Sequence, residues 1–396
     1  MACMKHSILL EPRTISSRNL QNICRLFQYI LAIIYIMSSM KYLRRITFLS
    51  LFAYLYGEPK STINRLAKTS LIQFTDAELP LDFEKSIGEQ IRGFKQDKNL
   101  IGMDNYYNAL FDSVKNDPFF DTMFLEANFQ NKLGGECYIF HRGNDKYIVF
   151  RGSDTPIDIL IDLTIETVPL LVGNVLTDEK IRVHRGFLEQ MKNYNFIQQI
   201  TKVVNPKNGM NLYIIGHSLG SACGLILSYY MHHAYKSFDI NINCSSVGGP
   251  VVGNSAWTKS FNDIFCNGNK KRRFDRLINE RDIIPNLHTL AFNIFDRIPL
   301  LTRTTKQINP PSSSTKFILL RYFNKYTYEY QHVGHETWIV RYETFELFGH
   351  TWSAKEPELI RVQNENHTFV TPTVADVLNI AYDHMINYQK WLSTNI

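Results

Sequence analysis

The sequence lacks an apolar run long enough to cross a membrane, and it lacks any spacing of cysteines that suggests a metal site. A membrane-spanning helix needs about 20 apolar residues, and the apolar runs at residues 26–37 and 46–56 are both shorter. Of the 6 cysteines, Cys244 and Cys266 are a possible disulfide pair, with buried free thiols as the alternative. No internal repeat is visible. The length of 396 residues is enough for one large or two ordinary globular domains.

The formal net charge of +6 is concentrated at the N-terminus. Residues 1–57 contain seven basic side chains against the single acid Glu11, which accounts for the whole excess. The basic residues are Lys5, Arg13, Arg18, Arg25, Lys41, Arg44 and Arg45. Because the remaining residues are neutral overall, the excess does not indicate a nucleic-acid partner.

Residues 1–57 have the composition of a leader that directs export. Basic residues at 41–45 followed by the apolar run 46–56 give the layout of a secretory signal peptide that ends near Gly57, with Met40 as an alternative start. Leu55 stands where a cleavage site needs a small residue, so an uncleaved signal anchor is the alternative. We therefore predict a secreted protein, or one anchored to a membrane by its leader, with a single domain over residues 58–396.

The stretch LYIIGHSLG at residues 212–220 predicts a nucleophile. Its first residues form a continuous apolar run, which is typical of a buried parallel strand, and the residues after it have a helical pattern. A strand that turns directly into a helix through G-x-S-x-G is a nucleophile elbow, in which Ser218 is exposed to substrate. Gly216 and Gly220 are expected where backbones approach too closely for a side chain.

A second strand end upstream could complete an oxyanion hole. The segments CYIFH (137–141) and YIVF (147–150) predict a β-hairpin whose second strand ends in Arg151-Gly152-Ser153. Acyl transfer needs two N–H donors, one after the nucleophile and one from a distant strand end. Leu219 supplies the first by position and Ser153 is the candidate for the second, although the same residues could form an ordinary turn.

The segment after Ser153 has two chemically different faces. Ile157, Leu160 and Ile161 fall on one side at helical spacing, while acidic residues repeat every four positions on another side. A lid that closes over an apolar pocket and opens at a lipid surface needs both faces. An ordinary surface helix is the alternative.

Candidates for the catalytic acid and base follow Ser218 in the sequence. The predicted strand RLIN (276–279) is followed by Asp282, and hydrolases with this elbow have the order serine, acid, histidine. Glu280, Asp275 and Asp263 compete with Asp282 for the role of the acid. The histidines after Asp282 are His288, His332, His335, His350, His367 and His384, and position alone does not choose among them.

Together these blocks resemble the fungal-type class three lipase family. The resemblance covers YIVFRGS, VHRGF (183–187), GHSLG, GGPVVGN (248–254) and NERDIIPNL (279–287), and it continues more weakly through HVGHETW (332–338) and YDHMINY (382–388). It implies an α/β-hydrolase fold, a mostly parallel central sheet flanked by helices, with an amphipathic lid from Thr155 to about Leu163.

The same resemblance implies roles for individual residues. It makes Ser218 the nucleophile, Asp282 the acid and His384 the base, with the oxyanion hole at Ser153 and Leu219. Two features depart from the family pattern: an apparent insertion near residues 289–325, and a continuous helical face around His384, where a catalytic histidine needs a loop. His335 and His350 are therefore the alternative bases.

We predict a serine-dependent hydrolase of lipid carboxylic esters, most specifically a triacylglycerol lipase. A phospholipase A1 is the first alternative, and a catalytically inactive lipid-binding protein on the same fold is the second. A peptidase is a third option, which the amphipathic lid disfavours. The reaction requires no metal and no organic cofactor. The expected partner is a lipid ester at a lipid–water interface, with transient contact to a membrane or lipid-droplet surface and no nucleic acid or obligate protein partner.

Overall fold

The computed structural model describes more than half of the chain. The described residues are 38–55, 82–93, 111–112, 114–131, 135–152, 167–172, 175–176, 178–192, 195–280, 282, 284–286, 330–341, 344–347, 350–353, 358–363, 388 and 391–392. The lid residues Ile157, Leu160 and Ile161 and the apparent insertion at 289–325 lie outside them.

The chain divides into two compact units, Met1–Arg45 and Ile46–Ile396. In the first unit, residues 38–45 are helical. In the second unit, residues 46–52 are helical and lead into the 3₁₀ turn η1 (Ala53–Leu55). The apolar run that begins at Ile46 is thus grouped with the large unit, and this grouping differs from the domain start expected at residue 58.

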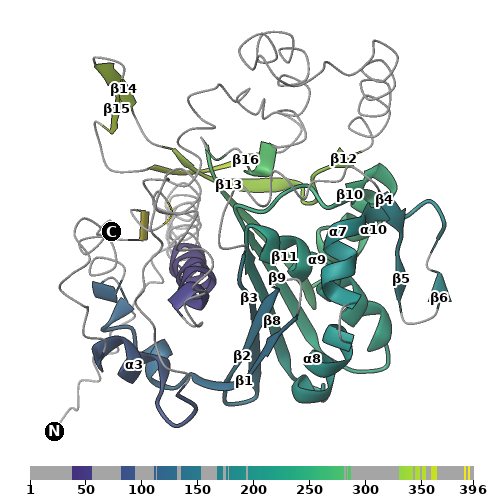
Figure 1. The fold of residues 1–396 in the computed structure, drawn as a ribbon, viewed down its shortest axis with the longest axis horizontal. Coiled ribbons are helices and arrows are strands. Elements are labelled where there is room, and N and C mark those ends of the chain that lie inside the picture. The colour runs from purple at the N-terminus through teal and green to yellow at the C-terminus, as the bar shows by residue number, and fades with distance from the viewer. Residues whose placement is uncertain are drawn as a thin grey trace, which may run out of the picture. The chain divides into compact units, whose positions relative to one another are not determined.

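A mixed sheet in the order β1-β2-β3-β8-β9-β11-β13-β16 forms the centre of the large unit (Figure 1). Its strands are β1 (Phe124–Gln130), β2 (Glu136–Arg142), β3 (Asp145–Phe150), β8 (Asn211–His217), β9 (Asn241–Val247), β11 (Arg272–Asn279), β13 (Glu336–Arg341) and β16 (Glu358–Gln363). The strands from β3 to β13 run parallel, and antiparallel pairs close both edges. The predicted hairpin of β2 and β3 is confirmed, and so is the mostly parallel centre.

Short strands form smaller sheets beside the central one. A four-stranded sheet in the order β12-β10-β7-β4 and the two-stranded ribbons β5-β6 and β14-β15 are present. Their bounds are β4 (Thr167–Pro169), β5 (Leu171–Val172), β6 (Val175–Leu176), β7 (Arg182–His184), β10 (Gly253–Asn254), β12 (Tyr330–Gln331), β14 (Thr344–Leu347) and β15 (His350–Ser353).

One face of the central sheet is an apolar packing face. It is covered by α7 (Arg185–Lys192), α8 (Phe196–Val204), α9 (Leu219–Ala234) and α10 (Ser255–Phe265). Strand residues such as Ile148, Phe150 and Ile214 pack there against α9, which is buried along most of its length. A helix that is apolar on all sides belongs in a core, and α9 fixes the position of the residue before it, Ser218.

The opposite face carries aromatic and polar side chains. Tyr147 of β3 stacks on Tyr213 of β8 with ring centroids 4.5 Å apart, and Phe119 of α5 (Pro118–Asp121) meets the edge of Tyr147 at 5.6 Å. The helix α3 (Ile87–Gly93) packs beside α5. Because side chains of a strand alternate between its faces, Tyr213 lies on the same face as His217.

The helical residues 46–52 are also part of this second layer. None of their side chains is more than 3% exposed, and Phe48 packs edge-on against Phe120 of α5 at 4.9 Å between centroids. Complete burial of an Ile, Leu or Phe side chain contributes roughly 1.5–3 kcal/mol, so the five large apolar residues contribute roughly 7–15 kcal/mol as an upper estimate. That contribution is comparable to the whole net stability of a typical domain, about 5–15 kcal/mol.

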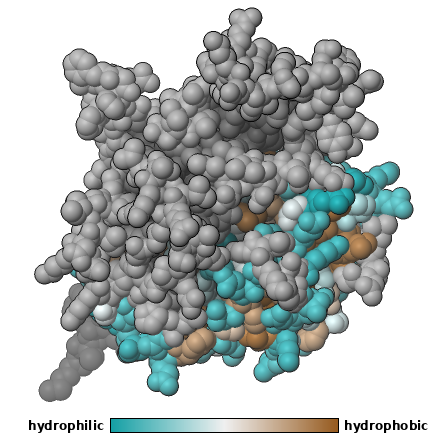
Figure 2. All heavy atoms as spheres, viewed as in Figure 1, coloured by the Kyte–Doolittle hydropathy of each residue, from teal (hydrophilic) through white to brown (hydrophobic). Residues whose placement is uncertain are grey.

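The described surface is mainly polar, with small apolar areas between polar residues on the face in Figure 2. Among the described residues, the large apolar side chains classed as exposed are Phe83, Leu171 and Phe238, which belong to different elements. The described part of the chain contains no helix that is both long and apolar enough to span a bilayer.

Candidate active site

Ser218 occupies the turn between β8 and α9, as predicted, but its side chain is buried, with 1% of its surface exposed, rather than open to substrate. Its backbone has φ 56° and ψ −130°, a positive φ that few residues other than glycine adopt. The amide of Ser218 donates to the carbonyl of Val247 at the end of β9 (3.0 Å), and its own carbonyl accepts from the Ser221 amide (2.9 Å). The turn is therefore held on both sides in a strained conformation, and strain of this kind is a feature of functional sites.

The glycines of the elbow are required by close backbone contacts. A Cβ on Gly216 would lie 2.2 Å from the carbonyl oxygen of Gly220, and a Cβ on Gly220 would lie 2.4 Å from the carbonyl oxygen of Phe150. No side chain fits at either distance. The expectation that both positions lack side chains because backbones approach is confirmed.

The candidate oxyanion donors are only partly described. Leu219 is the first residue of α9, so its N–H is one of the four that have no partner inside the helix, and the positive end of the helix dipole lies there. Ser153 lies outside the described residues, but Gly152 directly before it approaches the elbow. A Cβ on Gly152 would lie 2.8 Å from the Cβ of Ser218.

Asp282 is fully buried just beyond β11, before the 3₁₀ turn η4 (Ile284–Asn286). Its Oδ1 accepts from the Ile284 amide (3.0 Å), and its Oδ2 accepts from the Tyr388 hydroxyl (2.9 Å). Two hydrogen bonds compensate the buried carboxylate for the water it has lost. The ends of β8, β9 and β11 meet at one edge of the sheet, so Asp282 and Ser218 lie at the same edge.

Tyr388 connects the acid to the elbow, and analysis of the sequence did not assign it a role. Its hydroxyl accepts from the Asn279 amide (2.7 Å) while it donates to Asp282, and its ring meets the edge of His217 at 5.7 Å. Burial and the charge of Asp282 raise the pKa of Tyr388 well above its usual value, which keeps the phenol a donor. The available signal was the tyrosine that ends the YDHMINY block.

Two of the three competing acids are engaged elsewhere, whereas Glu280 directly follows β11. Asp263 pairs with Lys259 (2.6 Å) on the surface of α10, and Asp275 pairs with Arg273 (2.7 Å) near the start of β11. Burial raises the pKa of Asp275. Neither carboxylate is at the end of the strand that carries Asp282.

The candidate bases differ in how they are placed. His384 lies outside the described residues, as do His288 and His367. His335 is exposed before the start of β13 and bonds to the Asn267 side chain (2.8 Å). Because β13 runs parallel to β11, His335 lies at the opposite edge of the sheet from Asp282. His350 begins β15 in a separate two-stranded ribbon.

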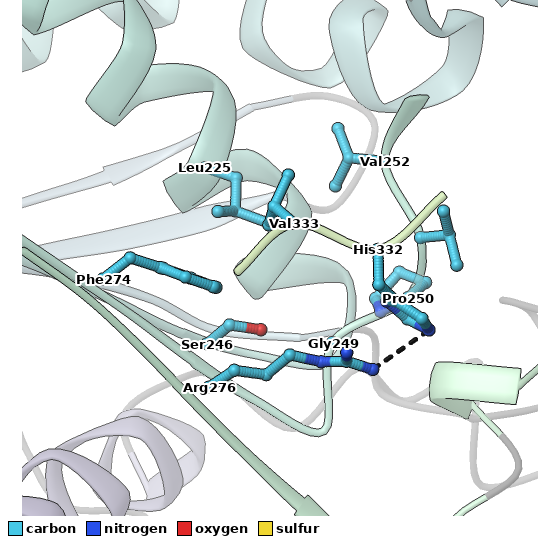
Figure 3. Close-up of a pocket in the computed structure, with 10 residues that line it drawn as sticks. Leu225, Ser246, Gly249, Pro250, Val252, Phe274, Arg276, His332 and Val333 are labelled. Atoms are coloured by element: carbon cyan, nitrogen blue, oxygen red, sulfur yellow. Dashed lines mark hydrogen bonds between the residues drawn. The ribbon is translucent and has the colours of Figure 1, made fainter. Parts of the chain in front are cut away.

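His332 belongs to a small pocket rather than to the elbow. Figure 3 shows its ring against the Arg276 guanidinium (3.0 Å), and its Nε2 also lies 2.8 Å from the Pro285 carbonyl oxygen. The pocket is lined by Leu225, Ser246, Gly249, Pro250, Val251, Val252, Phe274, Arg276, His332 and Val333. It has space for about one water molecule, too little for an acyl chain.

The cysteines that the structure describes are not among the residues of the candidate site. Cys137, Cys223, Cys244 and Cys266 are free thiols. Burial raises the pKa of Cys223, Cys244 and Cys266 to about 12, so these thiols stay protonated and unreactive.

Three comparisons with known proteins agree with this geometry. The family model for lipase (class 3) matches residues 147–292. A lipase of Rhizomucor miehei is 31% identical over 154 residues, which cover 37% of this chain and 38% of the relative. The crystal structure of the Lip2 lipase from Yarrowia lipolytica has a TM-score of 0.52 and 14% identity, over 89% of this chain and 93% of that one.

The resemblance to the class 3 lipase family predicted from the sequence blocks is confirmed over residues 147–292. The likeness to the Lip2 lipase, at its low identity, shows the α/β-hydrolase fold alone. The sequence alignment spans well under half the length of the Rhizomucor miehei lipase. Activity and substrate must therefore be argued from the site.

Proposed function

We propose that the protein is a serine-dependent hydrolase of lipid carboxylic esters, and more specifically a triacylglycerol lipase. The observation that carries the proposal is Ser218, held at φ 56° between β8 and α9, with the buried carboxylate of Asp282 at the same sheet edge. A strained serine at the start of a helix, with an acid on a later strand, is the arrangement that acyl transfer needs.

In the proposed mechanism, His384 takes the proton of Ser218 as the serine attacks the ester carbonyl, and then gives that proton to the departing alcohol. Asp282 orients the imidazole, and water releases the acyl group by the same route. The position of Tyr388 supports this assignment. Tyr388 bonds to Asp282 and lies four residues after His384, and four residues span at most about 14 Å.

The oxyanion is proposed to bind the N–H groups of Leu219 and Ser153. Leu219 begins α9, and the neighbour of Ser153, Gly152, closely approaches the Cβ of Ser218. Loss of one such donor costs about 3 kcal/mol of transition-state stabilisation. Ile157, Leu160 and Ile161 are proposed to face the acyl chains from a lid, which would bring the enzyme into transient contact with a lipid surface. The basic and apolar N-terminal segment is proposed to direct the protein to the secretory route.

The test is hydrolysis of emulsified triolein and of phosphatidylcholine, side by side, by the full chain. Ser218→Ala and His384→Ala should each lower the rate by about 10⁴-fold or more. Two matched controls should retain activity. They are Ser228→Ala, a buried serine of α9 that bonds to the Gly224 carbonyl, and His335→Ala, at the opposite sheet edge.

Each result has a distinct meaning. Faster cleavage of triolein supports the triacylglycerol lipase, and faster cleavage of phosphatidylcholine indicates a phospholipase A1 instead. Activity that survives His384→Ala contradicts that base and directs attention to His350. Binding to the emulsion without any hydrolysis contradicts the enzyme and indicates the inactive lipid-binding protein.

A further inference from the structure

The apolar segment expected to leave with the leader is buried in the folded unit. The side chains of residues 46–52 are at most 3% exposed on every side of the helix, including the polar Thr47 and Ser50. The buried Ser50 hydroxyl donates a hydrogen bond to the Thr47 carbonyl oxygen within the helix (2.8 Å). A signal peptide or lipid-facing anchor has no need of such burial, whereas a core helix requires it.

Tyr54, at the end of this segment, reaches the nucleophile elbow. Its hydroxyl lies 3.0 Å from Nδ1 of His217, and the two rings meet edge-on at 5.6 Å between centroids. The same hydroxyl lies beside Gly152, where a Cβ would come within 2.1 Å of it. Tyr54 therefore fills the space between the end of β3 and the end of β8.

A side chain from an ion pair packs over the ring of Tyr54. The Arg151 guanidinium lies 5.3 Å above the ring centroid, within the range of a cation–π interaction. Arg151 in turn pairs with the buried carboxylate of Glu136 (2.8 Å), which also accepts from the Tyr138 hydroxyl (2.8 Å). Arg151, Glu136 and Tyr138 therefore form a partly buried network that holds the Tyr54 ring with its hydroxyl next to His217.

The direction of the hydrogen bond follows from the neighbours of the phenol oxygen. The backbone N–H of Gly152 is directed at this oxygen, which favours donation of the hydroxyl hydrogen to Nδ1 of His217, the direction that the second measurement below tests. A neutral imidazole that accepts at Nδ1 carries its proton on Nε2. Tyr54 consequently selects one tautomer of the residue that precedes Ser218.

We propose that residues 46–56 remain in the folded protein and that Tyr54 is a positioning residue, which holds Gly152 and His217 in place beside Ser218. Any processing of the leader then occurs before Ile46. Residues 46–56 are then neither part of a cleaved signal peptide nor a membrane anchor, which are the two roles expected from their composition. The positioning role builds on the proposed nucleophile. The two measurements below do not use hydrolysis, so their failure is distinguishable from a failure of the proposed function.

The first measurement is the N-terminus of the folded protein. The full chain is produced in a yeast secretory host, and protein from the medium and from the cells is read by intact mass and N-terminal sequencing. We expect every folded product to contain residues 46–56. A folded product that starts at or after residue 58, with an unfolding temperature equal to that of the longer product, overturns the proposal.

The second measurement reads the ring of His217 by long-range ¹H–¹⁵N NMR, with His217→Gln used to assign its signals. The full chain should show the Nε2–H tautomer, and Tyr54→Phe should shift the His217 ring nitrogens towards the average of both tautomers. Tyr229→Phe is the matched control, because it removes a similar hydroxyl bond, to Ser260 (2.8 Å), between α9 and α10. Unchanged His217 signals in Tyr54→Phe refute the positioning role.

Discussion

The two faces of the central sheet are built in different ways. The face under α7, α8, α9 and α10 is an apolar core in which Trp257, Phe261 and the side chains of α9 pack together. The opposite face brings polar side chains to the strand ends, where Tyr54 and Tyr388 meet His217. One face fixes where the elbow lies, and the other fixes the hydrogen bonds around it.

The difference separates two kinds of support for a catalytic residue. On the apolar face, position depends on volume, and a wrongly sized side chain displaces the backbone. On the polar face, the position of a side chain depends on the direction of its hydrogen bonds. Each hydroxyl donates a single hydrogen, so it must be oriented towards its acceptor. Substitutions on the two faces should therefore fail in different ways.

The largest effect is expected at the junction of β8 and α9. Gly220→Ala places a Cβ 2.4 Å from the Phe150 carbonyl oxygen, so the strand and helix must separate, at a cost of about 3 kcal/mol or more. Gly224→Ala is the control one turn later, because its Cβ would meet Ile214 at an ordinary 3.5 Å. The control should be neutral or more stable by about 0.5–1 kcal/mol. Urea unfolding measures both, and equal losses would remove the volume argument for this face.

Tyr388→Phe tests the polar face with a change of a single atom. It removes one hydrogen bond from Oδ2 of Asp282 and one from the Asn279 amide, which should cost about 1–3 kcal/mol because both groups are buried. The pH profile of ester hydrolysis should change as well, since the carboxylate that we propose to orient the base loses a donor. A stability loss with an unchanged pH profile would make Tyr388 a packing residue like those on the other face.

The pH dependence of unfolding at alkaline pH should report the burial of Tyr54 and Tyr388. Burial raises the pKa of Tyr54 and Tyr388 above the usual value near 10. Their contribution to stability is complete below about pH 10 and is lost at higher pH, since the unfolded phenols ionise first. The unfolding temperature of Tyr54→Phe should depend less on pH between about 10 and 11.5 than that of the unaltered chain. Identical slopes contradict the burial of Tyr54.

The smallest effect is expected at His232, on the side of α9 remote from the elbow. Burial, followed by the charge of Arg272, lowers the pKa of His232 to about 4, and Nδ1 accepts from the Arg272 guanidinium (3.1 Å). Its stabilising contribution is present above about pH 6.5 and is lost as the pH falls towards 4, because the unfolded imidazole binds a proton first. His232→Gln should flatten the change of unfolding temperature between those values, while hydrolysis at neutral pH is retained.

The fold and the elbow were predictable from the sequence because their signals are local. GHSLG follows an apolar strand and precedes an apolar helix, and both elements form as predicted around Ser218. Asp282 followed from its place after a strand, and the structure buries it there. In each case the residues of the sequence pattern are neighbours in the chain, and the same residues form the strand, turn or helix that was predicted.

The roles of Tyr54 and Tyr388 were not predictable in this way. Tyr54 bonds to a residue 163 positions away, and Tyr388 bonds to one 106 positions away, so no local pattern connects the partners. The composition of the run 46–56 predicts a leader because an exported helix and a core helix can be equally apolar, and the burial of residues 46–52 is the observation that favours a core helix. Only its surroundings distinguish the two.

The long separation of these partners has a consequence for the order of events during synthesis. The helix at 46–52 leaves the ribosome long before Tyr388, a donor to Asp282, is made. At about 5–20 residues per second, roughly 20–70 seconds separate them. We expect a ribosome-bound chain stalled before residue 388 to be unreactive towards a serine-directed phosphonate, and synthesis past residue 388 followed by release to switch the reaction on. A hydrolase that acts on lipid esters would in this way stay silent beside the membranes of the cell that makes it.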